Sequence, residues 1–468
     1  MISRQTACSL GALVLILYPA TPFARTNKVT TGLSTSYDYS DRQYDPVTGD
    51  PTPESITNTS DDDYNRLVLQ PLFSFVSDSQ VDHFKLRAAP SIKYDLSGDQ
   101  TDWDNDLFLS AERSLSKAWQ LNVSNAFLRS DYHDPQSGIA VDTGTQDSQN
   151  PTPELSTDLG RTRYWRNTLK GGAKYIYGQE SLVNLGGDFI VLRNDDAETL
   201  TSYEDYDRYA VNLNNEHRFN NIWKTIAELS FVRGDYAASD TTTPDVAPTS
   251  TTDNLSGDLK EYHLLATVEN NYFQQNKVSL NYNYIGTRYD EDLKDNGDIH
   301  QSRLTWRRDF SQKLNTTLGA GPSYEKTEGR DANWGGNGLA EINYLIQHGS
   351  FTFAVEKRYD VDNFSGTDER GFIDYWDTRF LFNYQLVESV TLNGRIAYRY
   401  EDREDPDLLT YHKDLITTGL GLHYSFLQYY SAGLNYTFTK QISDRIGDDY
   451  DDHRLLFALS WEQEWLRW

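Results

Sequence analysis

The feature that most constrains the fold is a series of segments in which apolar and polar side chains alternate. The last of them, His453-Arg-Leu-Leu-Phe-Ala-Leu-Ser-Trp461, is the sharpest example. Its larger apolar side chains share one face: Leu455, Phe457, Leu459 and Trp461. A period of two is typical of a β-strand whose two faces meet different surroundings. A sheet that ends in such a strand has an edge to hide, and pairing with the first strand hides it completely. The pattern therefore predicts a closed barrel.

Similar segments recur along the whole chain, and the connections between them are alternately short and long. We count about 20 strands (about 18 to 22) of about 10 to 14 residues each, as in antiparallel barrels of the outer membrane. The clearest is predicted over 81–96. Short turns, such as those near 220–221, 274–276 and 347–349, alternate with loops at 40–63, 131–161, 235–259 and 290–299. This asymmetry predicts short periplasmic turns and long external loops.

The composition agrees with a membrane barrel that encloses water. Only 37% of the residues are hydrophobic and the mean hydropathy is −0.69, but 13% are aromatic, which a disordered acidic chain would not show. The sequence contains no apolar run of about 18 residues, so no transmembrane helix is predicted. In a barrel wall only alternate positions face lipid, so few apolar residues suffice. The expected fold class is therefore all-β, a single transmembrane antiparallel up-and-down β-barrel over residues 25–468.

Residues 1–24 are predicted to be a signal peptide. Arg4 precedes an apolar core at 10–17, and Ala24 is a suitable cleavage residue. Cys8 and Met1, the single cysteine and methionine, both lie in this leader, so the mature chain would have no disulfide and no thiol chemistry. The formal net charge of −27 becomes −28 without Arg4, which argues against nucleic-acid binding.

Aromatic side chains are frequent near the ends of the expected strands. Amphipathic rings are favoured at the headgroup level of a membrane, and aromatic residues also have a general β-propensity. We interpret the following residues as outward-facing girdles: Trp103, Trp119, Trp223, Trp306, Trp376, Tyr398, Tyr400, Tyr424, Tyr430 and Tyr436.

The opposite register of the same strands carries many lysines and arginines. The candidate lumenal residues are Lys85, Arg87, Lys93, Arg166, Lys170, Lys174, Arg303, Arg307, Arg358, Arg379, Arg395 and Arg399. Basic rings favour anions in pores, and arginine offers paired donors to carboxylate or phosphate. The alternative is that these bases pair with lumenal acids and only stiffen the wall. The candidate partners are Asp95, Glu216, Asp377 and Glu401.

Other chemistry has little support in the sequence. Acid-rich loops, such as that at 290–298, can offer oxygen ligands to calcium, but we interpret them as solvated external loops. We predict no metal and no cofactor. His423-Tyr-Ser425 resembles the His-x-Ser pairing of outer-membrane phospholipase, although Phe426-Leu427 departs from that family. The expected register points both side chains into the lumen, away from lipid, so we predict no enzyme.

The C-terminal third resembles a known family. Arg358-Tyr359, Tyr398-Arg-Tyr400 and the closing Asp449-Tyr-Asp-Asp-His-Arg-Leu-Leu-Phe-Ala-Leu-Ser460 are similar to an uncharacterised group of proteobacterial β-barrel porins. The resemblance covers about the last 120 residues by eye. It implies an outer-membrane barrel associated with exopolysaccharide synthesis and export, and it assigns no binding residue.

These observations lead to one expected function and one alternative. The expected function is an outer-membrane pore of a Gram-negative cell that passes anionic solutes, with an exopolysaccharide as the specific candidate. The loop at 131–161 is long enough to fold inward and constrict this channel. The alternative is a non-conducting structural or adhesive barrel, which an inward, plug-like loop would favour. Expected partners are outer-membrane lipid and lipopolysaccharide, the outer-membrane assembly machinery and polysaccharide export components.

Overall fold

The computed structural model describes most of the chain. The described residues are 25–44, 63–98, 100–131, 163–195, 204–236, 257–273, 275–290, 295–366, 370–404, 410–445 and 448–468. The expected leader at 1–24 and nearly all of the loop at 131–161 lie outside them. No helix of the described part is long and apolar enough to cross a membrane.

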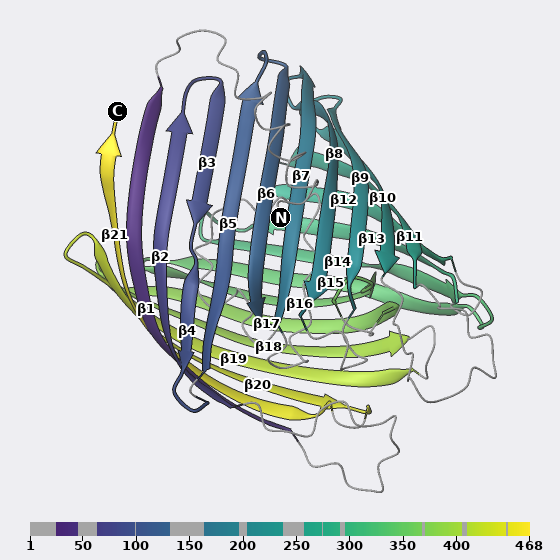
Figure 1. Cartoon of the computed structure of the whole chain (residues 1–468). Coiled ribbons are helices and arrows are strands. Elements are labelled where there is room, and N and C mark those ends of the chain that lie inside the picture. The colour runs from purple at the N-terminus through teal and green to yellow at the C-terminus, as the bar shows by residue number, and fades with distance from the viewer. Residues whose placement is uncertain are drawn as a thin grey trace, which may run out of the picture.

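The described residues form a closed antiparallel β-barrel (Figure 1). The strand segments are β1 (Thr26–Tyr44), β2 (Tyr64–Asp78), β3 (Asp82–Ala88), β4 (Ser91–Asp95), β5 (Gln100–Ser114), β6 (Trp119–Asp131), β7 (Arg163–Gly178), β8 (Ser181–Asn194), β9 (Tyr206–Arg218), β10 (Trp223–Tyr236), β11 (Leu259–Phe273), β12 (Asn276–Tyr289), β13 (Gly297–Asp309), β14 (Leu314–Thr327), β15 (Asn333–Ile346), β16 (Gly349–Val361), β17 (Phe372–Val387), β18 (Val390–Glu404), β19 (Tyr411–Phe426), β20 (Tyr430–Ser443) and β21 (Tyr450–Arg467). Each wall strand pairs with the next, and β21 pairs with β1. Because β3 and β4 both pair with β2 and with β5, they are two parts of one wall strand, and the barrel has 20 strands. The predicted fold class and the predicted number of strands are confirmed.

The strand predicted without interruption over 81–96 is divided by a proline. Pro90 has no N–H to donate, and the pairing with β2 stops at Ala88 and resumes at Ile92. The register does not shift, since Phe73 pairs with Ala88 and Leu69 pairs with Ile92. The break is therefore local, and the inward and outward faces stay the same on both sides of it.

The last strand is longer than the alternating segment that ends at Trp461. β21 runs to Arg467, so the tail that follows Trp461 belongs to the wall and pairs with the beginning of β1. The backbone N–H of Asn27 donates to the carbonyl of Trp468 at 2.7 Å. Both ends of the described chain therefore lie at the same end of the barrel, together with the short turns. We call this the short-turn end, and the opposite one the long-loop end.

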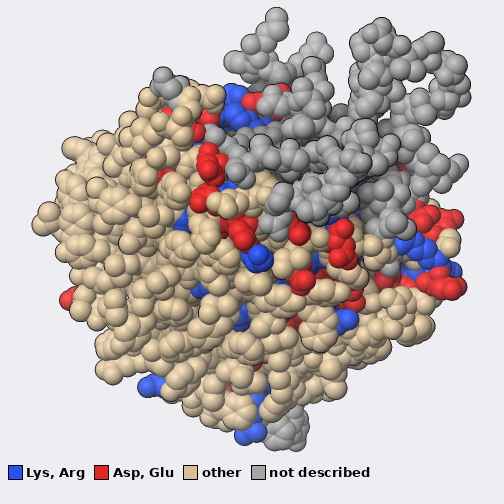
Figure 2. Space-filling model, turned by 90° about the horizontal axis from the view of Figure 1, so that it is seen from below, with Lys and Arg blue, Asp and Glu red and all other residues tan. Residues whose placement is uncertain are grey.

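The two faces of the wall differ as the alternation predicts. Leu455, Phe457 and Leu459 are exposed on the outer face, and eight of the ten girdle aromatics are exposed there as well; Trp306 and Tyr400 are partly covered. Viewed from below the orientation of Figure 1, much of the surface carries no charge, and the charged side chains gather on one part of this face (Figure 2). Arg66, Asp104 and Asp131 are buried on the inner side.

Candidate functional site: the lumen and its crossing segment

A short segment between β16 and β17 folds into the barrel. We call residues 362–366 with Arg370 and Gly371 the crossing segment. Its side chains contact strands that lie four or more strands away around the wall, from β12 back to β9. This segment was not predicted from the sequence. The candidate inward loop, at 131–161, lies outside the described residues apart from Asp131.

Asn363 is the centre of the contacts between the crossing segment and the wall. Its amide donates to Glu261 Oε1 at 2.7 Å, and its Oδ1 accepts from the Tyr289 hydroxyl at 3.1 Å and from the Gly371 N–H at 3.1 Å. The Tyr236 hydroxyl donates to its backbone carbonyl. Asn363 is 3% exposed, so these bonds replace water that the side chain has lost. They therefore fix the position of the segment.

Apolar and cationic contacts add to these hydrogen bonds. Phe364 packs in a buried cluster with Tyr206 and Tyr236, and the Tyr206 hydroxyl donates to the Phe364 carbonyl at 3.1 Å. The guanidinium of Arg370 lies 3.4 Å from the centre of the Tyr236 ring and bonds to Glu204. The absence of a side chain at Gly234 makes room for the Phe364 ring, since a Cβ at Gly234 would lie 2.8 Å from it. The segment is thus held against one sector of the wall.

The tips of β16 and β17 also lie inside the neighbouring wall. The side-chain amide of Gln301 on β13 donates to the Tyr359 carbonyl at 2.8 Å and accepts from the Tyr359 N–H at 3.1 Å. Tyr359 and Phe372 pack with Ile285 and Ile299 in a second buried cluster. The Gln301 side chain therefore makes the two hydrogen bonds to β16 that the backbone of a neighbouring strand would otherwise make. The end of β16 can then leave the wall and lead into the crossing segment.

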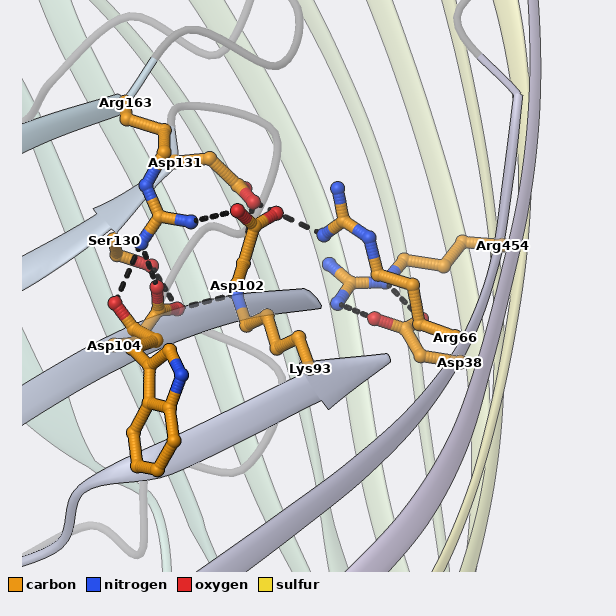
Figure 3. Close-up of polar contacts among 10 residues, drawn as sticks. Asp38, Arg66, Lys93, Asp102, Asp104, Ser130, Asp131, Arg163 and Arg454 are labelled. Carbon is orange, nitrogen blue, oxygen red and sulfur yellow. Dashed lines mark hydrogen bonds and ion pairs between the residues drawn. The ribbon is translucent and has the colours of Figure 1, made fainter. Parts of the chain in front are cut away.

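A network of buried ion pairs occupies the inner face of the strands from β2 to β7, near the long-loop end (Figure 3). Arg66 bonds to Asp131 at 3.0 Å, and the Lys93 ammonium lies 2.6 Å from Asp104. The Arg163 guanidinium reaches Asp102 at 2.6 Å and Asp104 at 2.7 Å. Among the described residues the network joins three cations to three carboxylates. It joins β2, β4, β5, β6 and β7 across the wall, which favours a structural role.

Breaking this network is expected to destabilise the barrel. Arg66→Ala leaves the buried carboxylate of Asp131 without its closest cation, which costs about 3–5 kcal/mol of unfolding free energy. Urea unfolding of the folded protein in detergent, followed by the shift in gel mobility, measures this loss. The double variant Arg66→Met with Asp131→Leu removes both charges and is expected to lose clearly less. Equal losses in both variants would contradict a role for the unpaired charge.

The candidate lumenal bases lie on the inner register, and many of them are ion-paired. The pairs are Arg87–Asp106, Lys93–Asp104, Arg303–Glu356, Arg307–Asp309, Arg358–Asp360 and Arg399–Glu401. Lys170 stands opposite Asp188, and Arg166 stands opposite Leu128 and Leu192. Of the acids proposed as their partners, Glu401 binds Arg399, whereas Glu216 binds Lys224.

Four of the candidate bases differ from the rest. Within the described part of the chain, Lys85, Lys174, Arg379 and Arg395 have no carboxylate at ion-pair distance. Arg379 and Arg395 are exposed, and they are diagonal neighbours, because Arg379 pairs with Ala397 and Leu381 pairs with Arg395. All four lie away from the long-loop ends of their strands. A role of the twelve bases in conducting a solute stays a prediction.

The His-x-Ser pair lies on the inner register too. Ser425 Oγ and His423 Nε2 are 3.3 Å apart near the short-turn end of β19. Tyr424 between them is exposed on the outer face. Both polar side chains therefore point away from the face on which a lipid substrate would lie.

Comparison with known proteins places this fold among bacterial barrels. No protein-family model and no curated protein matches the sequence. Among solved structures, a mutant of the ferric enterobactin receptor PfeA of Pseudomonas aeruginosa is similar with a TM-score of 0.53 and 9% identity, over 93% of this chain and 81% of the receptor. The siderophore receptor PirA of the same organism has a TM-score of 0.51 and 8% identity, over 95% and 81%. OccK9 of P. aeruginosa matches with a TM-score of 0.44 and 11% identity, over 93% and 98%. At these identities the likeness shows the fold alone, and that fold is the one of Gram-negative outer-membrane barrels.

Proposed function

We propose that this protein is a passive channel of the outer membrane, exported after cleavage of the leader at 1–24. The observation that carries the proposal is a closed 20-strand barrel with a polar inner face that is narrowed by the crossing segment. Barrels of 16–18 strands or more enclose an aqueous channel unless they are plugged. The crossing segment is short and packs against one sector of the wall, which suits a constriction.

The preferred solute in this proposal is an anion. The paired bases near the long-loop end are neutralised, whereas Arg379 and Arg395 present their guanidinium groups to the lumen without a carboxylate in the described residues. Guanidinium groups match carboxylates and phosphates, and weak contacts at several places allow passage without trapping. An acidic exopolysaccharide is the specific candidate, and export components and the outer-membrane assembly machinery are the matching partners.

Conductance in a planar bilayer tests the proposal. The purified protein under a salt gradient is expected to show single-channel currents whose reversal potential reports preference for the anion. Addition of an acidic polysaccharide to the short-turn side is expected to reduce the current. A folded protein without currents would refute the channel, and currents that favour cations would refute the anionic solute.

A second candidate is a non-conducting structural or adhesive barrel. The crossing segment is the observation that favours it, since a tightly bonded inward segment such as that around Asn363 also suits a closed barrel. Under this alternative the wild-type protein is silent in the bilayer, and a variant with a loosened segment conducts.

A further inference from the structure

The outer wall is hollowed where β15 and β16 separate. Pairing of β15 with β16 extends from Ile346–Gly349 only as far as Gly338–Lys357, whereas β14 pairs with β15 up to Asn333. Beyond this point β16 turns into the barrel, as the bonds between Gln301 and Tyr359 show. The separation leaves a groove on the outer face with a volume of about 910 Å³.

The lining of this groove is apolar. Gly336, Gly338, Ala320 and Ala340 form its floor with small side chains. Larger side chains stand around them: Val278, Leu304, Trp306, Leu318, Val355 and Trp376. All of these positions belong to the outward register. Because Val278 and Trp306 lie near the short-turn ends of β12 and β13, the groove extends along much of the wall.

Among the described residues of the lining, Lys357 is the single charged side chain, and it lies toward the long-loop end of β16. Its ammonium is 3.0 Å from Asp374 Oδ2 and 5.4 Å from the centre of the Trp376 ring. An ammonium has three donors, so the bond to Asp374 orients Lys357 and leaves further donors for an anion. The groove is therefore amphipathic, with the Lys357–Asp374 ion pair at the end near the long loops and an apolar floor behind it.

We propose that this groove binds a phosphorylated acyl lipid of the lipopolysaccharide type from the outer leaflet. The acyl chain would lie on the floor of Gly336 and Gly338, and the phosphate would bind the Lys357 ammonium. The direction matches, because the long-loop end of an outer-membrane barrel faces the exterior, where the phosphates of this leaflet lie. Lipid bound here would also cover the separation between β15 and β16. The site rests on the outer-membrane location alone and not on conduction.

Lipid retention on the full-length protein tests the site. The protein is reconstituted with phosphatidylcholine and diphosphorylated lipid A, and lipids that stay bound are counted by native mass spectrometry. Gly338→Leu fills the groove without a backbone clash, since a Cβ at Gly338 has only an ordinary contact at 3.6 Å. Gly171→Leu, on the outward register of β7 with a Cβ contact at 3.9 Å, is the matched control.

The expected results distinguish the apolar floor of the groove from the phosphate contact at Lys357. Gly338→Leu is expected to lose retained lipid A, and Gly171→Leu to keep it. Lys357→Gln is expected to weaken retention about tenfold and to abolish the preference for lipid A over its dephosphorylated form. Lys260→Gln, which removes the cation of another outer pair, Lys260–Asp290, is the control for charge. Equal retention in all variants, or retention without a preference for phosphate in the wild type, would overturn the proposal, whatever the conductance.

Discussion

Replacing residues 362–371 with an Asn-Gly dipeptide is expected to raise the single-channel conductance about twofold or more, because a wide barrel conducts in proportion to its narrowest section. The replacement removes Asn363, Phe364 and Arg370 together, and with them the contacts to β9–β12. The dipeptide still joins two antiparallel strands, since Asn-Gly is a favoured hairpin connection. Currents in a planar bilayer, recorded at the same salt concentration for both proteins, give the ratio.

A second loop deletion provides the control. Residues 328–332, which join β14 to β15 at the same end, are replaced with the same dipeptide. Asn333 at the edge of this turn pairs with Glu325, so the hairpin itself is kept. This control is expected to conduct like the wild type. If both deletions raise the conductance equally, the crossing segment is not the constriction, and if neither changes it, the narrowest section lies elsewhere.

Reversing the charge of Arg379 and Arg395 is expected to change the sign of the reversal potential. Both guanidinium groups are exposed to the lumen and lack an ion-pair partner among the described residues, so Arg379→Glu with Arg395→Glu converts two attractive sites into repulsive ones. In a tenfold gradient of KCl the current through an ideally selective pore reverses at about 59 mV. This range is wide enough to resolve a change in the sign of the reversal potential. The reversal potential of the double variant is measured beside that of the wild type.

Two further variants show whether the lumenal position matters. Arg193→Gln removes a cation of the outer face, where Arg193 is bound to Asp207, and it is expected to leave the reversal potential unchanged. Arg399→Gln removes a base that Glu401 already neutralises, and a smaller shift is expected. An equal shift for all variants would point to the overall charge of the protein and would contradict a local role of Arg379 and Arg395.

The parts of the fold that depend on local pattern could be predicted from the sequence. Alternation along each strand gave the barrel, the number of strands and the register of Arg454 and Leu455 on opposite faces. The break at Pro90 was visible as well, and it was missed because the alternation continues across it in the same register. The alternating pattern alone shows whether a residue faces outward or inward, and this is sufficient to predict the strands of the barrel wall.

The parts that depend on distant contacts could not be predicted. Phe364 in a polar loop is the one local signal of the crossing segment. The partners of the segment, Tyr206, Tyr236 and Glu261, lie 100 residues or more away in sequence. The same holds for the basic lumen. Arg303 is paired with Glu356 and Lys93 with Asp131, and no spacing along the chain identifies such partners. Alternation places a charge in the lumen but does not show whether it is neutralised.

The seam between β1 and β21 has a consequence for biogenesis. Ser34 and Ser460 share a hydrogen bond across 426 residues, so the first strand made must wait for the last before its edge is covered. Formation of such distant pairings is slow, and open strand edges promote aggregation meanwhile. A nascent chain of this protein therefore needs holding in an unassembled state during secretion. A truncation that removes only β21 would leave the edges of β1 and β20 open. We expect such a chain to be degraded as an unassembled protein rather than to form a slightly smaller barrel.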